Sequence, residues 1–210
     1  MRGFKTEGIV LKRRDFGEAD RILTVFTLHK GKLPVLAKGV RRITSRRAGN
    51  VELLNRVIIY LYQGKGMPIL TEAESLETFS KIKEDLTLST YAFHIIELVD
   101  KLTAENQDNR ILYRYLVGVL RKLEKNPRQI FIRAFEAKIL SDLGFASFRE
   151  VGDFGDVGEI LKGLEIKSWD EIERMKINEK EALELEQVLR YHLENVIEGQ
   201  LKSRRFLKKI

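Results

Sequence analysis

The fold is decided by two strand-like segments, Thr6-Glu-Gly-Ile-Val-Leu-Lys-Arg13 and Arg21-Ile-Leu-Thr-Val-Phe-Thr-Leu28, and by the turn-like Asp15-Phe-Gly-Glu-Ala-Asp20 between them. The two segments are rich in Ile, Val, Leu and Thr, and the second also contains Phe26, a composition that favours strands. Three more such segments follow before residue 80, at Leu33–Gly39, Leu54–Tyr62 and Ile69–Leu76. Five short strands with glycine at the turns predict a small closed barrel, and a five-stranded OB-type barrel is expected because closure leaves no unpaired edge.

From about residue 78 the hydrophobic period changes from 2 to 3.6, which predicts helices. Three long helical patterns cover Leu86–Leu102, Ile111–Leu123 and Ile130–Leu143. Capping boxes at Ser168-Trp-Asp-Glu171 and Asn178-Glu-Lys-Glu181 predict two further helix starts. The chain is therefore predicted to be α+β, with an N-terminal five-stranded OB-fold β-barrel over residues 1–79 followed by an all-α helical domain over residues 80–210. Within the latter, residues 145–165 are rich in glycine and show little periodicity.

Composition limits the classes of function. The chain has no cysteine, which excludes disulfides, thiol nucleophiles and cysteine-bound zinc. Its longest apolar runs are far too short to cross a bilayer, and the N-terminus lacks the apolar stretch of a signal peptide. The expected location is the cytoplasm, in association with the nucleoid, and no membrane partner is expected.

The charge is distributed very unevenly. The stretch Arg21–Val51 contains 31 residues and no Asp or Glu, although about four or five would be expected from the average acid content. It holds eight basic residues: Arg21, Lys30, Lys32, Lys38, Arg41, Arg42, Arg46 and Arg47. Its densest part, Lys38–Gly49, has the glycine and serine content of a loop. Clustered cations repel one another unless a partner neutralises them, and phosphate is the commonest partner.

A catalytic constellation is not apparent in the sequence. The three His residues, His29, His94 and His192, are widely scattered, and packing or solvent roles are favoured for His94 and His192. Asp15, Glu18 and Asp20 could form the metal site of a nuclease, but a turn whose carboxylates pair with Arg13, Arg14 and Arg21 is the favoured interpretation. The glycine-rich segments lack the spacing of a phosphate-binding NTPase loop. The protein is predicted not to be an enzyme and to bind neither metal nor cofactor.

Nucleic acid is the favoured partner of the basic segment. Tyr60 and Tyr62 lie two residues apart on a predicted strand, so their rings face the same way, and Phe16 lies in the first turn; bases could stack on such rings. Tyr60 and Tyr62 could equally cover the barrel floor where the helices dock. The basic C-terminal tail is either a cap for the last helix or a second phosphate contact. The predicted DNA-binding residues are Lys30, Lys32, Lys38, Arg41, Arg42, Arg46, Arg47, Tyr60, Tyr62, Lys202, Arg204 and Arg205.

With these residues in view, the sequence resembles the RecO family of bacterial recombination mediators. The resemblance is strongest in Gly8–Thr27, Gly31–Leu33, Ala37–Arg42 and Ser45–Arg47, and it continues in Phe135–Phe145 and Leu201–Leu207. It implies an N-terminal OB-fold and a C-terminal helical domain. It also implies binding to single- and double-stranded DNA, annealing of complementary strands and help in loading a recombinase onto strands coated by single-strand-binding protein. The implied partners are RecR and the acidic, apolar C-terminal tail of the single-strand-binding protein, with the recombinase as an indirect partner.

One feature departs from the family pattern. Many members carry a four-cysteine zinc module just after the motif that ends here at Phe145, whereas this chain has the Gly-rich segment 145–165 and no cysteine. Zinc is therefore expected to be absent. An RNA-binding or ribosome-associated OB module, with the helical part as a protein-docking platform, is the alternative function.

Overall fold

The computed structural model describes residues 2–149 and 154–197. Two compact units can be distinguished. One contains the chain up to Phe79 together with Thr103–Tyr113, and the other contains Ser80–Leu102 and the chain from Arg114 onward. None of the helices in the described ranges is both long and apolar enough to span a bilayer.

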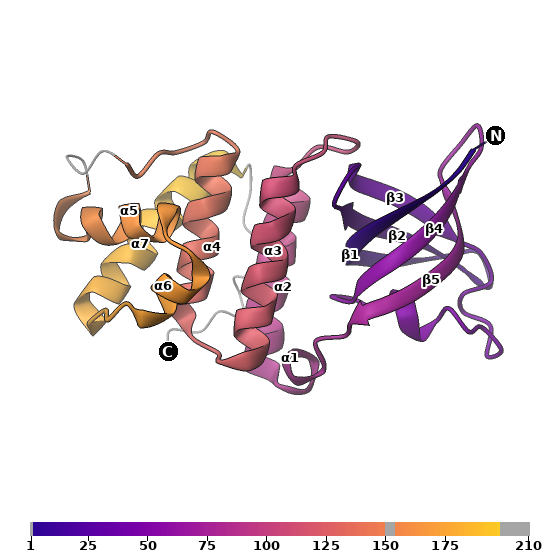
Figure 1. The fold of residues 1–210 in the computed structure, drawn as a ribbon, viewed down its shortest axis with the longest axis horizontal. Helices are drawn as coiled ribbons and strands as arrows, with labels where there is room; N and C mark the ends of the chain where they lie inside the picture. Colours follow the sequence, from indigo (N-terminus) through magenta and orange to yellow (C-terminus); the bar gives the residue numbers. More distant parts are fainter. Residues whose placement is uncertain (1, 150–153, 198–210) are drawn as a thin grey trace. The chain divides into compact units, whose positions relative to one another are not determined.

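The first unit is a closed five-stranded barrel in the strand order β1-β2-β3-β5-β4 (Figure 1). This order and the closure confirm the predicted OB-type barrel. The strands are β1 Arg2–Phe16, β2 Asp20–Thr27, β3 Gly31–Ala37, β4 Arg56–Gln63 and β5 Ile69–Glu77. Alternate residues such as Leu23, Val25, Val57 and Ile59 point inward and form the buried core.

The barrel closes weakly between β3 and β5. These strands pair only at Leu36 and Ile69, so most of this edge of β5 has no strand beside it. The chain between β3 and β4 covers it instead. The Arg47 guanidinium donates to the carbonyls of Leu70 at 2.8 Å and Thr71 at 3.3 Å, and the Asn50 amide donates to Ala73 O at 2.9 Å. This connection therefore forms part of the barrel wall.

Residues 103–113 pack on the barrel although helical segments precede and follow them in sequence. Gly31 has φ +61°, and a Cβ there would lie 1.9 Å from the carbonyl oxygen of Gln107, so only glycine fits. The Tyr113 hydroxyl donates to Glu7 Oε1 at 2.8 Å, and Arg56 Nε donates to the same oxygen at 2.7 Å. Burial, together with the negative charge of Glu7, raises the pKa of Tyr113 well above its usual value.

The second unit is helical, with α4 at its centre in contact with α2, α5, α6 and α7 (Figure 1). The helices are α1 Ser80–Glu84, α2 Leu86–Leu102, α3 Arg110–Lys125, α4 Gln129–Asp142, α5 Gly158–Ile166, α6 Trp169–Arg174 and α7 Glu179–Val196. The periodic patterns predicted α2, α3 and α4, and both capping boxes are present. α5 was not predicted, because its glycines lower helix propensity; burial of Leu161 and Leu164 supports it instead.

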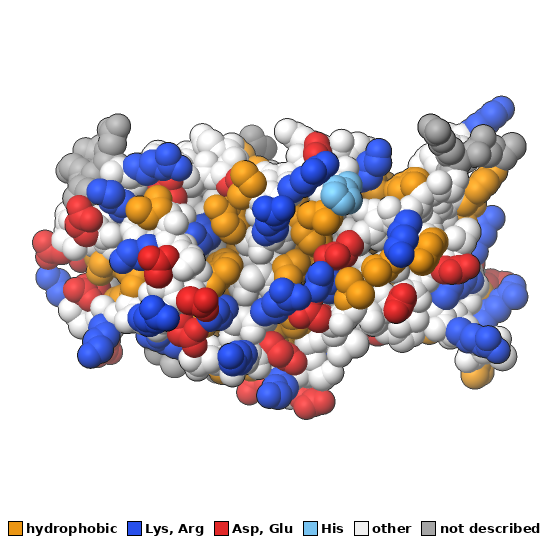
Figure 2. Space-filling model, in the orientation of Figure 1, with side chains coloured by type: hydrophobic (Ala, Val, Ile, Leu, Met, Phe, Trp, Pro, Cys, Tyr) orange, Lys and Arg blue, Asp and Glu red, His pale blue; other side chains and the backbone are white. Residues whose placement is uncertain are grey.

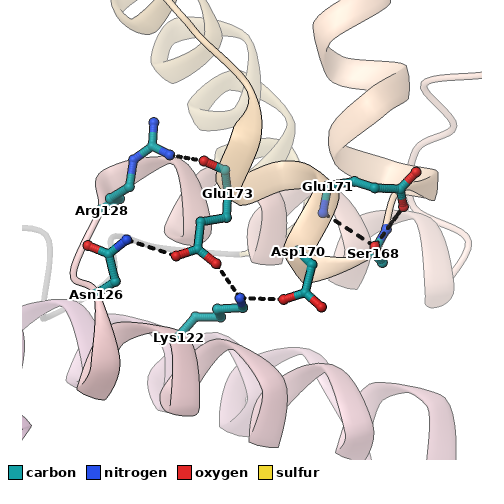
Figure 3. A network of polar contacts seen from close by, with 7 residues as sticks. All are labelled: Lys122, Asn126, Arg128, Ser168, Asp170, Glu171 and Glu173. Carbon is teal, nitrogen blue, oxygen red and sulfur yellow. Dashed lines mark hydrogen bonds and ion pairs between the residues drawn. The ribbon is translucent and has the colours of Figure 1, made fainter.

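A single face of α3 holds α6 (Figure 3). Gly118, Lys122 and Asn126 are spaced four residues apart, so they lie in one row along the helix. A Cβ at Gly118 would lie 2.1 Å from Trp169 Nε1. Lys122 Nζ binds Asp170 at 2.6 Å and also Glu173, whose other oxygen accepts from Asn126 at 2.8 Å.

His94 has a structural role, as the favoured interpretation predicted. Its Nε2 lies 2.7 Å from Glu136 Oε1, both side chains are buried, and Arg133 Nη1 contacts both oxygens of the same carboxylate. Burial alone would raise the pKa of Glu136, but the charges and hydrogen bonds of Arg133 and His94 outweigh it and hold the pKa at about 2. Glu136 is therefore an ionised group that joins α2 to α4.

Candidate nucleic-acid interface

The basic loop, residues 38–50, leaves β3 through a tight connection to the β1–β2 turn. Gly39 has φ +65°, and its amide donates to Asp20 Oδ1 at 2.7 Å. The amide of Arg41 donates to Ala19 O at 2.9 Å. The loop ends in the 3₁₀ turn η1, Gly49–Val51, whose Val51 is fully buried. The loop is thus anchored at both ends.

The loop cations are of two kinds. Arg41 and Arg47 are tied to the protein. Arg41 Nε lies 3.3 Å from Asp15 Oδ2 and its Nη1 donates to Gly17 O at 3.2 Å, while Arg47 bonds Lys38 O at 2.8 Å besides the β5 carbonyls. Lys38, Arg42 and Arg46 are exposed and make no ion pair with another described residue. These last three, called the free cations below, are the loop side chains best placed to attract an anion.

The free cations surround a shallow concavity of about 450 Å³, which Thr44, Ser45 and Asp20 also line. On the face drawn in Figure 2, Lys and Arg side chains gather over the barrel end from which the loop projects in Figure 1. Over the helical part of the same view, basic and acidic side chains alternate. The loop itself holds five Lys or Arg residues and no acid between residues 38 and 50, so anions should be attracted there.

The structure does not bring Lys30 and Lys32 to this concavity. Both belong to the β2–β3 hairpin, at the opposite end of β3 from Lys38. Lys30 is exposed and lines a different hollow, with Phe4, Leu33 and Met67. Lys32 is only 9% exposed, because residues 105–107 cover that part of β3, so its prediction as a phosphate contact is not supported.

Tyr60 and Tyr62 point outward from β4, on a face that also carries acids. Cross-strand pairing sets Lys5, Tyr60 and Glu72 in one row and Glu7, Ile58 and Glu74 in the next. Lys5 Nζ lies 5.1 Å from the Tyr60 ring centroid, and a hydrogen bond to Tyr60 raises the pKa of Lys5. The carboxylate of Glu72 beside the Tyr60 ring repels phosphate, which counts against base stacking there, whereas Tyr62 pairs with Gly3 and Ile69.

On the opposite outer face, sequence reasoning noted the ring of Phe16 but missed Lys12 and Arg14 as site residues. Lys12, Arg14 and Phe16 are exposed at alternate positions of β1, beside outward residues of β2. The period-2 pattern of the strands was the signal that could have found them. Leu23 and Val25 of β2 face the core, so the residues between them, and the residues of β1 that pair with those, face outward. The predicted tail contacts Lys202, Arg204 and Arg205 lie outside the described residues.

The acidic turn is occupied by structural contacts. Asp15 Oδ1 accepts from Arg21 Nε at 3.0 Å, and that hydrogen bond lowers the pKa of Asp15. Asp20 caps Gly39, and Arg13 pairs with Glu52. Within residues 2–149 and 154–197, no three His, Cys, Asp or Glu side chains are grouped so that they could hold a metal. The geometry supports the turn interpretation for Asp15 and Asp20 and gives the nuclease hypothesis no support. Of the three predicted arginine partners, however, only Arg21 pairs with a carboxylate of the turn, because Arg13 pairs with Glu52 and Arg14 makes no ion pair with another described residue.

The segment expected in place of a zinc module is organised by a carboxylate. Glu165, buried near the end of α5, accepts from Ser141 Oγ at 2.7 Å, from the Phe148 amide at 2.8 Å and from Arg149 Nε at 2.8 Å. The Phe148 ring meets the rings of Phe154 and His192 at centroid distances of 5.4 and 5.5 Å. These contacts connect the end of α4 to α5 and α7.

Comparison with protein-family models gives two matches. Residues 1–79 match the model described as "Recombination protein O N terminal", and residues 83–147 match "Recombination protein O C terminal". The chain is also similar to curated proteins named "DNA repair protein RecO". It is 40% identical over 149 residues to that of Acetivibrio thermocellus, covering 70% of this chain and 59% of the relative.

Two further relatives match over nearly their whole length. The protein of Moorella thermoacetica is 30% identical over 243 residues, covering 99% of this chain and 91% of the relative. That of Desulforamulus reducens is 29% identical over 246 residues, covering 100% and 96%. In the matches to the relatives of Acetivibrio, Pelotomaculum and Roseiflexus, however, the chain spans only 51–59% of the relative's length.

Proposed function

The chain belongs to the RecO family, and we propose that it is a non-catalytic DNA-binding protein of DNA repair. It binds single- and double-stranded DNA, anneals complementary strands and helps to load a recombinase onto strands coated by single-strand-binding protein. Annealing requires that the repulsion between two phosphate backbones be screened, and a cationic surface achieves this without a nucleophile or a nucleotide cofactor.

The observation that supports this proposal is the separation of the loop cations into tied and free. Arg41 and Arg47 fix the loop to the barrel, and Lys38, Arg42 and Arg46 remain exposed around one concavity. Because the loop is already anchored, little ordering entropy has to be lost when phosphate binds.

The proposed protein partners, RecR and the tail of single-strand-binding protein, follow from the family. For an acidic, apolar tail we propose a groove of about 250 Å³ between α4 and α7, lined by Ile130, Leu183, Arg128 and Arg133. Arg133 Nη2 already lies 3.2 Å from Glu186, so a tail carboxylate would have to displace Glu186. Leu183 is half-exposed, and Leu183→Ser should weaken binding of a tail peptide without unfolding α7.

The DNA-binding proposal is tested by Lys38→Ala/Arg42→Ala/Arg46→Ala. Its matched control, Lys101→Ala/Arg114→Ala/Lys176→Ala, removes the same charge from exposed positions of the helical unit. The salt dependence of single-strand affinity should flatten by ~0.7 per lost phosphate contact in the loop variant, hence by about 2 for three contacts, and should stay unchanged in the control. Equal slopes in the two variants would contradict the proposal.

The activity itself is tested by annealing complementary strands coated with single-strand-binding protein. The wild type and the control variant should accelerate annealing, and the loop variant should lose most of this effect. Competition between single-stranded DNA and RNA at fixed salt tests the alternative function. A clear preference for RNA would favour an RNA-binding module over a repair protein.

A further inference from the structure

We infer that the bases of a bound single strand lie on the outer face of β1, β2 and β3, with Phe16 as the stacking ring, and not on the face of Tyr60 and Tyr62. This inference rests on the proposed function, because it concerns the same DNA partner. It adds a base-contacting surface to the phosphate-contacting loop.

Cross-strand pairing builds this face in rows. Directly paired residues point to the same side of a sheet, so the register alone places them together. Arg14 pairs with Ile22 and Ile22 with Leu36, which makes one row across three strands. The next row is Lys12, Thr24 and Pro34, and beyond the first row Phe16 pairs with Asp20.

The middle of the face is apolar and partly open. Ile22, Leu36 and Pro34 are each half-buried, so they offer hydrocarbon surface without an overlying element that closes it completely. Phe16 is 50% exposed and makes no ring contact with any described aromatic side chain. An unpaired phenyl ring beside an apolar strip is a surface on which bases of any sequence can stack.

The cations border this strip. Arg14 is exposed and has no ion pair with another described residue, and Lys12 is one outward position away, about 6.6 Å along the strand. At the far end, Lys38 follows directly after β3 and leads into the basic loop. Asp20 is the acid of the Phe16 row, and one of its oxygens already accepts from Gly39. Phosphates can therefore follow the cations while the bases cover the apolar strip.

Phe16 is held in a fixed relation to the free cations. Asp15, the preceding residue, binds Arg41 of the loop at 3.3 Å, and Arg41 also donates to the carbonyl of Gly17, the following residue, at 3.2 Å. The ring and the loop thus belong to one anchored surface. A strand held by the loop phosphate contacts would reach Phe16 without a change of fold.

The outer face of β4 is the alternative, and its charge decides against it. Its rows contain Lys5 with Glu72, Glu7 with Glu74, and Arg56 with Glu77. Arg56 pairs with Glu7 and Glu77, and four carboxylates still face two cations. The Tyr60 ring is already engaged by Lys5. A phosphate backbone crossing this face would meet repulsion where the face of β1–β3 offers attraction.

The test uses tryptophan as a local reporter, since base stacking on an indole quenches its fluorescence. Phe16→Trp and Tyr60→Trp are compared as oligothymidylate is added, with the signal of the native Trp169 in the wild type subtracted. Quenching is expected in Phe16→Trp only. Quenching in Tyr60→Trp without quenching in Phe16→Trp would overturn the inference.

A second measurement uses Phe16→Ala, with Tyr60→Ala as its control. Loss of one stacking ring should weaken single-strand binding about 5- to 150-fold. Duplex affinity should hardly change, because paired bases do not expose their faces. Equal weakening of single-strand and duplex binding, or none, would contradict base stacking at Phe16. If the wild type bound neither single-stranded nor duplex DNA in a salt-dependent way, the proposed function itself would fail. If binding depended on the loop cations but Phe16→Ala bound single strands as the wild type does, only the inference about Phe16 would be refuted.

Discussion

Arg46 and Arg47 are neighbours of identical chemistry, and replacing each of them separates a DNA contact from a structural tie. Arg47 donates at 2.8 Å to the carbonyls of both Leu70 and Lys38, and more weakly to Thr71. Hydrogen bonds from a charged donor contribute about 1.5–3 kcal/mol each, and the lower end applies to a half-buried side chain. Arg47→Ala should therefore lower the free energy of unfolding of the barrel by about 2–3 kcal/mol. Arg46→Ala should change it by less than about 0.5 kcal/mol.

Urea unfolding followed by circular dichroism measures these free energies, and hydrogen exchange of residues 70–73 reports whether the loop still covers β5. Lysine variants make the distinction sharper. A single ammonium group cannot span two carbonyls as the guanidinium fork does, so Arg47→Lys should remain destabilised. Arg46→Lys keeps its charge and should bind DNA nearly as the wild type does. The assignment of roles would be refuted if Arg47→Ala unfolded with the free energy of the wild type and if the salt dependence of its DNA affinity flattened as much as in Arg46→Ala.

Two further predictions concern the helical unit. Gly118→Ala places a methyl group 2.1 Å from Trp169 Nε1. We therefore expect the free energy of unfolding to fall by about 1–3 kcal/mol and the near-ultraviolet circular dichroism of the chain's single Trp to change. An unchanged spectrum would contradict the close packing. Glu136 has a pKa of about 2 in the folded state against 4.5 ordinarily, so the unfolded state binds its proton first as the pH falls. The free energy of unfolding, measured by urea titrations at several pH values, should therefore drop by about 3 kcal/mol between pH 4.5 and 2. Glu136→Gln should remove this pH dependence. An equally steep loss in the variant would show that other carboxylates cause it.

Local features of the fold were predictable from the sequence. Glycine and turn residues separated the strands correctly, and Gly144, with φ +76°, ends α4 as its position indicated. The capping boxes marked the starts of α6 and α7 because they depend on residues only three positions apart. α5 escaped prediction because tertiary burial, and not local propensity, supports it.

The roles of the basic residues were less predictable, since their partners are distant in sequence. Arg47 reaches a carbonyl 23 residues away, and Lys32 is covered near Glu105. Neither fact can be derived from a count of charges. Tyr60 and Tyr62 do share a face, as their spacing required, but Glu72 and Glu74 reached that face through strand pairing. Sequence therefore located the cationic segment, and only pairing showed which residues share a surface.

The acid-free segment has a physical explanation in the positions of the acids at its borders. Before the segment, Asp15 binds Arg21 and Arg41, and Asp20 accepts from the amide of Gly39. After it, Glu52 binds Arg13. These acids therefore fix the ends of the loop without neutralising its exposed centre. A carboxylate within the segment would be free to pair with the exposed cations and would reduce their attraction for phosphate. Anchoring by acids at the borders and exclusion of acids from the centre thus serve one requirement. The loop must be rigid and must also remain positively charged.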